Sequence, residues 1–144
     1  MTAPTEPAAG PAILPEVATK LERFFEQHPG SLVAVYLFGS QARGTAGPTS
    51  DVDVAVLFGA RPESTLAGQP FALEDELRGL LGKPVQLLTL DSAPPDLIHR
   101  VLRDGVLVAE RDRSARIRFE VAARNAYFDL KPFLDRYRRA GRVL

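Results

Sequence analysis

Two short groups of polar residues are placed where this sequence could carry out chemistry. Gly39 and Ser40 follow one apolar run, and Asp51 and Asp53 begin a second run after ten intervening residues. Residues two apart on a strand face the same side of a sheet, so the two carboxylates should project together. Adjacent carboxylates repel each other unless a cation lies between them, and oxygen ligands suit Mg²⁺ bound partly through substrate phosphates. We therefore predict that Asp51 and Asp53 bind metal. The alternative is a strand entry with two solvated acids.

The residues just upstream are suited to binding phosphate. Gly39 allows the backbone to turn sharply and to approach a ligand closely. Ser40 can start a short helix through Arg43, with its hydroxyl and free N–H groups directed at an anion. Arg43 itself either contacts phosphate or fixes the loop through an ion pair. A Walker A loop is excluded, because the positions after Gly44 lack the required Lys and Ser or Thr. The arrangement predicts a nucleoside triphosphate site.

Apolar periodicity predicts the elements that position these residues. Expected strands cover 31–38, 51–58 and 85–90, and a short apolar run at 106–108 follows the Asp104-Gly105 turn. Expected helices cover 16–27, a segment ending at Gly82, a segment opening at Pro95 and a long C-terminal stretch that Pro132 should kink or restart. This order predicts a protein of the α/β (mixed α+β) class, with a small mixed sheet, helices packed on it and a C-terminal helical extension. Tyr127 and Tyr137 lie at helical spacing with other apolar residues, so we expect them to pack in the core or at an interface.

Length and composition describe one globular domain with distinct ends. The chain has 144 residues, of which 45% are hydrophobic and 25% charged. Residues 1–15 contain four prolines among small side chains and are predicted to be disordered. Residues 16–110 should form the main domain, and 111–144 should form the helical extension packed on it.

Several classes of protein are excluded by the composition. There is no cysteine, and His28 and His99 are the only histidines, so disulfides and a structural zinc site are not expected. No apolar run approaches the roughly 20 residues of a membrane span, and the N-terminal residues do not resemble a signal peptide. We expect a cytoplasmic protein that does not enter the membrane.

The zero net charge conceals two unlike halves. Residues 1–99 carry 6 basic and 12 acidic side chains, whereas residues 100–144 carry 12 basic and 6 acidic ones. An asymmetry of this kind is typical of a chain in which one half holds cations and the other contacts an acidic partner. The alternative is an Arg-rich helix whose charged face is simply solvated.

The motif Gly39-Ser40-x10-Asp51-x-Asp53, with Arg43-Gly44 inside it, resembles the signature of the DNA polymerase β-like nucleotidyltransferases. More narrowly, the chain resembles the minimal nucleotidyltransferases of the MntA-type antitoxin family, which are encoded beside HEPN-type toxins. The likeness covers roughly residues 16–140 and includes the segments 83–95, 101–107 and 116–132.

This resemblance implies a fold, a reaction and a partner. Asp51 and Asp53 would be catalytic and would bind two Mg²⁺ ions, while Gly39, Ser40 and Arg43 would bind the nucleotide. AMP would pass from ATP to a tyrosine of a HEPN-type toxin encoded by a neighbouring gene, which would neutralise the toxin. No direct contact with nucleic acid is expected.

The sequence departs from the family pattern at the third carboxylate. Alignment on the third predicted strand places Gln86 there, and a carboxamide carries no charge and accepts no proton. Asp91 is a poor substitute, because five residues of strand move it roughly 16 Å away and turn it to the opposite face. Two alternatives therefore stay open beside protein adenylylation. One is a catalytically degenerate antitoxin that acts by binding, and the other is a nucleotidyltransferase for a small molecule.

Overall fold

A single four-stranded sheet forms the centre of the molecule. The computed structural model describes residues 13–28, 32–44, 47, 50–59 and 69–143. The strands are β1 (Ala34–Phe38), β2 (Val52–Leu57), β3 (Val85–Thr89) and β4 (Val106–Glu110), in the spatial order β3-β2-β1-β4. β1 pairs antiparallel with both β2 and β4, while β3 runs parallel to β2. The sheet is mixed, as predicted.

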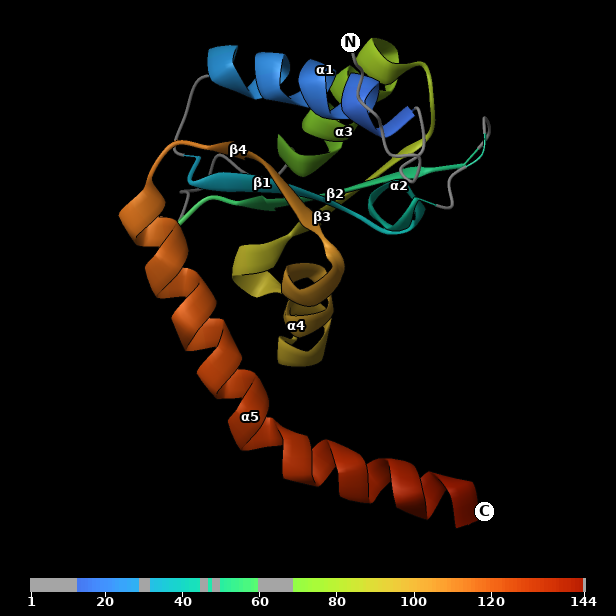
Figure 1. Ribbon diagram of the computed structural model, residues 1–144, viewed down its shortest axis with the longest axis vertical. Coiled ribbons are helices and arrows are strands. Elements are labelled where there is room, and N and C mark those ends of the chain that lie inside the picture. Colours follow the sequence, from blue (N-terminus) through green and yellow to red (C-terminus); the bar gives the residue numbers. More distant parts are fainter. Residues whose placement is uncertain (1–12, 29–31, 45–46, 48–49, 60–68, 144) are drawn as a thin grey trace, which may run out of the picture.

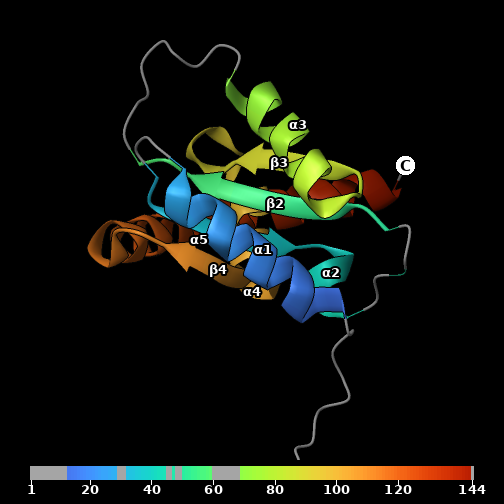
Figure 2. The same ribbon diagram turned by 90° about the horizontal axis from the view of Figure 1, so that it is seen from above.

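Helices cover both faces of this sheet. α1 (Ile13–Gln27) and α3 (Gln69–Leu81) lie on one face, and α4 (Pro95–Asp104) and α5 (Arg113–Val143) lie on the other (Figures 1 and 2). The single turn α2 (Ser40–Arg43) follows β1, and the 3-10 turn η2 (Leu90–Ser92) follows β3. The α/β fold with a long C-terminal helix matches the expectation.

The ends of the elements differ slightly from the sequence prediction. The bounds that were predicted shift by at most three residues. β4 forms where only a short apolar run was expected, because this segment pairs with β1 at the edge of the sheet. α1 begins at Ile13, so it includes the last three residues of the segment predicted to be disordered; residues 1–12 of that segment lie outside the described residues. Pro132 lies inside α5 and does not end it, and the helix changes direction partway along its length (Figure 1). A bend is expected there, because proline lacks the N–H that the carbonyl four residues earlier would accept.

Two apolar layers hold the helices against the sheet. Alternate residues of β2 explain the division: Val52, Val54 and Val56 enter the layer under α1 and α3, whereas Ala55 and Leu57 enter the layer under α4 and α5. All five are at most 2% exposed. One nearly continuous apolar run thus supplies both layers, which is typical of a central strand covered on two sides.

A polar network fixes the start of α5 against the sheet. The Tyr36 hydroxyl donates to Glu120 at 2.6 Å, and Arg116 donates to Glu120 at 2.8 Å and also to Glu110 of β4. Burial, together with the hydrogen bond to Glu120, raises the pKa of Tyr36 above its usual value. The network joins β1, β4 and α5, and it orients the first turns of the helix.

The two tyrosines of α5 have different surroundings. Tyr127 stacks on His99 of α4, with ring centroids 3.7 Å apart. Tyr137 is 78% exposed, so core packing was the wrong expectation for it, while packing at an interface stays a prediction. Among the described residues, no helix has the length and apolar character needed to cross a membrane.

Candidate active site

The predicted site residues meet at one end of the sheet. β1 ends at Phe38 opposite Asp53 of β2, and Asp53 in turn lies opposite Gln86 of the parallel strand β3. Gly39 follows Phe38 directly and leads into α2 (Figure 1). Antiparallel pairing brings the end of β1 to the start of β2, and parallel pairing brings the start of β3 to the same edge. Topology therefore assembles residues that are far apart in the sequence.

Gly39 is required by the position of Asp53. Its backbone has φ 75° and ψ −151°, a conformation that residues with a Cβ rarely adopt. A Cβ atom at position 39 would overlap Oδ2 of Asp53 and lie 3.0 Å from its Cγ. The sequence alone indicated a sharp turn at Gly39. The close approach of the Asp53 carboxylate depends on strand pairing, so it could not be predicted.

Ser40 and Arg43 are the first and last residues of α2. Ser40 is partly buried and directly follows the Gly39 turn. Gly44 ends the helix in the left-handed conformation, with φ 81°, and its N–H donates to the Ser40 carbonyl. The side chain of Arg43 lies outside the described part of the structure, so its role in nucleotide binding stays a prediction.

The two predicted metal ligands and Gln86 share one face. Val52 and Val54 point into the layer beneath α1 and α3, so Asp53 between them projects to the α4 and α5 side. Gln86 does the same, because it lies between the inward-facing Val85 and Leu87. The contact between Gln86 Nε2 and Oδ2 of the exposed Asp51, at 3.4 Å, is consistent with this arrangement.

The oxygen atoms of Asp51, Asp53 and Gln86 suit a hard cation, but they carry one negative charge fewer than three carboxylates would. Carboxylate and carboxamide oxygens are ligands that Mg²⁺ accepts, so Asp51, Asp53 and Gln86 fit the predicted ion. Within the described ranges, no group of three or more His, Cys, Asp or Glu side chains is arranged to hold a metal. The site therefore has two carboxylates, with Gln86 beside them, and a bound ion would receive less negative charge than from three acids.

Asp91 has a different task at the other end of β2. Its carboxylate accepts hydrogen bonds from the backbone N–H groups of Phe58 and Gly59, both at 2.8 Å. Phe58 directly follows the last residue of β2, whereas Asp53 lies near the first. Asp91 is thus a structural residue and does not replace the missing acid.

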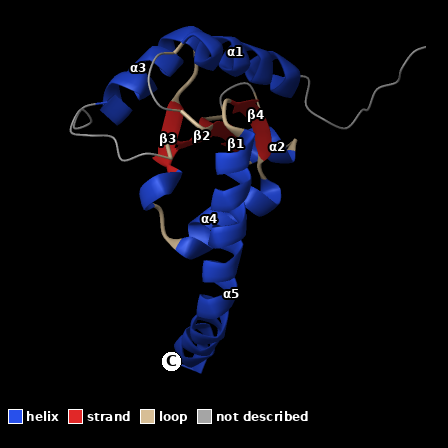
Figure 3. Ribbon diagram, turned by 90° about the vertical axis from the view of Figure 1, so that its left-hand side faces the viewer, coloured by secondary structure: helices blue, strands red, loops and turns tan. Residues whose placement is uncertain are grey.

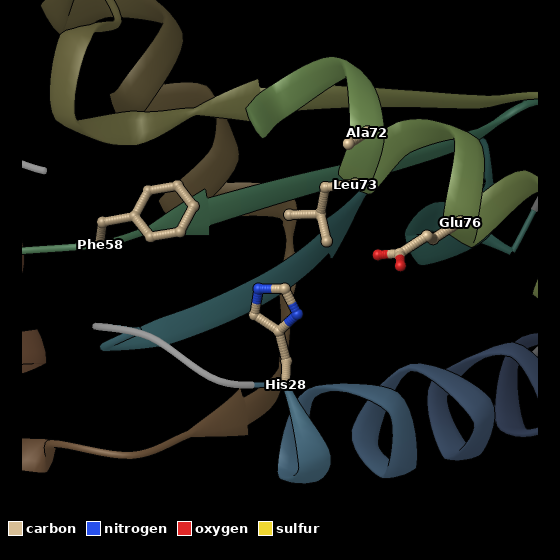
Figure 4. A pocket seen from close by; sticks show the side chains of 5 residues that line it. All are labelled: His28, Phe58, Ala72, Leu73 and Glu76. Atoms are coloured by element: carbon tan, nitrogen blue, oxygen red, sulfur yellow. The ribbon is translucent and has the colours of Figure 1, made fainter. Parts of the chain in front are cut away.

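A pocket of about 190 Å³ lies away from this site. It is lined by residues that directly follow α1 and β2 and by residues of α3, namely His28, Phe58, Ala72, Leu73 and Glu76 (Figure 4). The lining is mainly apolar, and burial lowers the pKa of His28. The pocket is on the face opposite to the one that Asp53 and Gln86 share, so it does not belong to the candidate active site.

Comparison with known proteins places these features in a family. The family model for "Polymerase beta, Nucleotidyltransferase" matches residues 19–114. Over 70 residues, the chain is 40% identical to the "Putative protein adenylyltransferase" of Methanocaldococcus jannaschii, a match that covers 49% of this chain and 72% of the relative.

Solved structures share the same fold. A toxin–antitoxin structure with AMP-PNP aligns with a TM-score of 0.64 at 22% identity, covering 83% of this chain and 97% of that one. A second structure contains the tri-AMPylated HEPN toxin of Shewanella oneidensis in complex with an MNT antitoxin. It aligns with a TM-score of 0.60 at 20% identity, covering 86% of this chain and 98% of that one. The family model spans both acids, Gly39 and Gln86, so the chain belongs to the polymerase β nucleotidyltransferase family and has the fold of the MNT antitoxins found with HEPN toxins.

Proposed function

We propose that this chain transfers AMP from ATP to a tyrosine of a HEPN-type toxin encoded by a neighbouring gene, and that this transfer neutralises the toxin. The observation that carries the proposal is the contact of Asp53 with the Gly39 turn, with Asp51 two residues earlier and hydrogen-bonded to Gln86, in a chain of the nucleotidyltransferase family. The adenylyltransferase relative and the AMPylated toxin in a structure of the same fold support a protein acceptor.

The proposed reaction is an in-line displacement at the α-phosphorus of ATP. The phenolic oxygen of the acceptor forms a bond to this phosphorus while the bond to the bridging oxygen of the β-phosphate breaks. Pyrophosphate leaves with the bonding electron pair, and the phenol loses its proton. When bound, Mg²⁺ would neutralise charge on the phosphate oxygens, with two ions expected.

The residues of this chain have separate tasks in that reaction. Asp51 and Asp53 hold the cations, and the Ser40 hydroxyl donates a hydrogen bond to a phosphate oxygen. Gly39 lets the Asp53 carboxylate lie directly against the turn that receives the phosphates. Arg43 at the end of the same turn contacts phosphate. Gln86 positions Asp51 through its amide but cannot accept the acceptor's proton. Losing a general base typically costs about 10²- to 10⁴-fold in rate, so slow transfer is expected.

Intact-mass spectrometry tests the proposal. The protein is incubated with ATP, Mg²⁺ and the product of the adjacent gene, and we expect AMP to be added to a tyrosine of that product. Asp53→Asn should abolish the addition. Asp75→Asn is the matched control, because Asp75 is an exposed acid on α3 that pairs with Arg78 and should not affect transfer. If the wild-type reaction yields no adduct, the proposal is wrong.

Because Gln86 stands where a third acid is expected, a second function is also a candidate: an antitoxin that neutralises the toxin by forming a complex, without AMP transfer. In that case, the double variant Asp51→Asn/Asp53→Asn should still neutralise the toxin. Loss of neutralisation with complex formation preserved would rule this candidate out.

A further inference from the structure

The second half of α5 carries large apolar side chains that are more than half exposed and on which no other element of the described structure packs. Phe128, Phe133 and Tyr137 are 55%, 60% and 78% exposed, and we call these three residues the distal α5 surface. The last α5 residue in either hydrophobic cluster of the described residues is Ala123, and Tyr127 makes the stacking contact with His99. Beyond it the helix extends away from the sheet (Figures 1 and 3).

A helix in this situation is poorly stabilised by its own chain. Most helical stability in proteins comes from packing of an apolar face, and among the described residues none of α5 beyond Ala123 belongs to a hydrophobic cluster. Pro132 weakens this segment further by removing one backbone hydrogen bond. Lys131 and Arg138 both pair with Asp135, but exposed pairs on one helix contribute little. Exposed aromatic side chains on such a segment are typical of a surface that another protein covers.

Charge indicates which kind of protein covers it. α5 carries nine basic and three acidic residues. Arg136 lies over the ring of Phe133, at 5.4 Å from its centroid, so the basic groups are interleaved with the aromatic ones. A second copy of the chain would bring one basic helix against another, which is unfavourable. An acidic protein surface with an apolar centre complements both features.

The side of the sheet that α5 occupies connects this surface with the candidate active site. Asp53 and Gln86 project to the face covered by α4 and α5, and both helices extend from that same side (Figure 3). A protein bound along α5 would therefore lie on the side to which the two polar side chains point. The opposite face, beneath α1 and α3, offers no such continuity.

We propose that the distal α5 surface binds an acidic surface of the acceptor protein and thereby selects which protein receives the nucleotide. This inference rests on the proposed function, because it names the docking surface for the same acceptor. α5 then serves as a docking element, separate from the residues that hold the cations and phosphates. Its folding and its recognition of the acceptor are coupled, since the acceptor supplies the packing that the helix lacks.

Binding measured without nucleotide tests the docking surface. The double variant Phe133→Ser/Tyr137→Ser should weaken the Kd for the product of the adjacent gene by about 100-fold or more, because buried aromatic anchors dominate binding at interfaces. Leu80→Ser is the matched control: Leu80 is a 39% exposed apolar residue on α3, on the opposite face, and its loss should leave the Kd within about twofold. Circular dichroism of each variant checks that it is folded.

Kinetics and charge variants add two independent measurements. The aromatic variant should raise KM for the acceptor and leave kcat and AMP-PNP binding unchanged, which a defect of the catalytic residues would not do. Arg136→Gln/Arg138→Gln/Arg139→Gln should slow association by about tenfold at low salt and by less at high salt.

The outcomes separate this proposal from the proposed function. Unchanged acceptor binding by the aromatic variant would overturn the docking surface, as would failure of the wild type to bind this acceptor. Sedimentation that shows a dimer dispersed by the aromatic variant, with acceptor binding intact, would assign the surface to a second copy instead. Acceptor binding that depends on α5 but is not followed by AMP transfer would support the docking surface and overturn the transferase function alone.

Discussion

Gly39→Ala probes the contact on which the candidate active site depends. The positive φ of Gly39 lies in a region that costs an alanine about 1–3 kcal/mol. The new methyl group would also overlap the Asp53 carboxylate, whose Cβ and Cγ lie 3.3 Å and 3.0 Å from the Cβ position. The carboxylate must therefore rotate away from the Gly39 turn. We expect the free energy of unfolding to fall by at least about 2 kcal/mol, or a Tm decrease of roughly 5–8 °C for a chain of this length.

A second glycine separates backbone strain from the overlap. Gly82, which ends α3, has φ 67° and no atom within 4 Å of the Cβ position, so Gly82→Ala reports the left-handed backbone alone, about 1–2 kcal/mol. Urea unfolding of both variants, and of Gly39→Ala in an Asp53→Ala background, forms a double-mutant cycle. Removing the carboxylate should reduce the cost of Gly39→Ala to that of its own backbone strain.

Metal binding supplies the functional measurement for the same variants. Mn²⁺ affinity, followed by electron paramagnetic resonance in the presence of AMP-PNP, should fall at least tenfold in Gly39→Ala, because an Asp53 carboxylate turned away is a poor ligand. Gly82→Ala should bind Mn²⁺ as the wild type does. If Gly39→Ala costs no more stability than Gly82→Ala and keeps its Mn²⁺ affinity, the reasoning that links Gly39 to Asp53 is refuted.

Three further changes have outcomes that follow from named contacts. Gln86→Asp places a third carboxylate opposite Asp53 and should speed AMP transfer by about tenfold or more in single-turnover assays; an unchanged rate would mean that Gln86 is not at the third-acid position. Arg116→Met breaks the ion pair with Glu110 of β4 and the pair with Glu120 within α5, and it should lower the free energy of unfolding by about 1–3 kcal/mol in urea titrations. Burial lowers the pKa of His28 below 6.5, so the unfolded chain binds more protons and stability should fall as the pH drops below 6.5. His28→Gln should flatten this part of the stability curve, and an equally steep decline in both proteins would contradict the assignment.

Local sequence patterns predicted three of the four strands, the long helices and the grouping of the candidate residues. Successive side chains of a strand alternate between the two faces of a sheet. Because Val52, Val54 and Val56 enter the layer beneath α1 and α3, Asp53 must point to the other face. Gln86 is at a matching position on the next parallel strand, which its alignment on Lys83-Pro84-Val85 predicted. The catalytic and binding roles of these residues stay predictions.

Helix periodicity was a weaker guide for α5. The spacing of Tyr127 and Tyr137 is equally compatible with packing on the core and with exposure, because it shows only that a helix has an apolar side. Whether anything covers that side depends on the direction in which the helix leaves the sheet. In the structure, Tyr127 stacks on His99, whereas Tyr137 extends beyond the domain.

The sequence by itself determined the order of the elements other than β4, the two carboxylates two residues apart and the absence of a third acid at position 86. These are local properties of chain chemistry and periodicity. The tertiary structure decided the rest. Strand pairing brings Gly39 against Asp53, and Asp91 holds the far end of β2. The basic end of α5 projects on the side of the sheet to which the candidate site residues point. The physical reason is that these are relations between segments distant along the chain, and only packing of the two apolar layers determines how such segments meet.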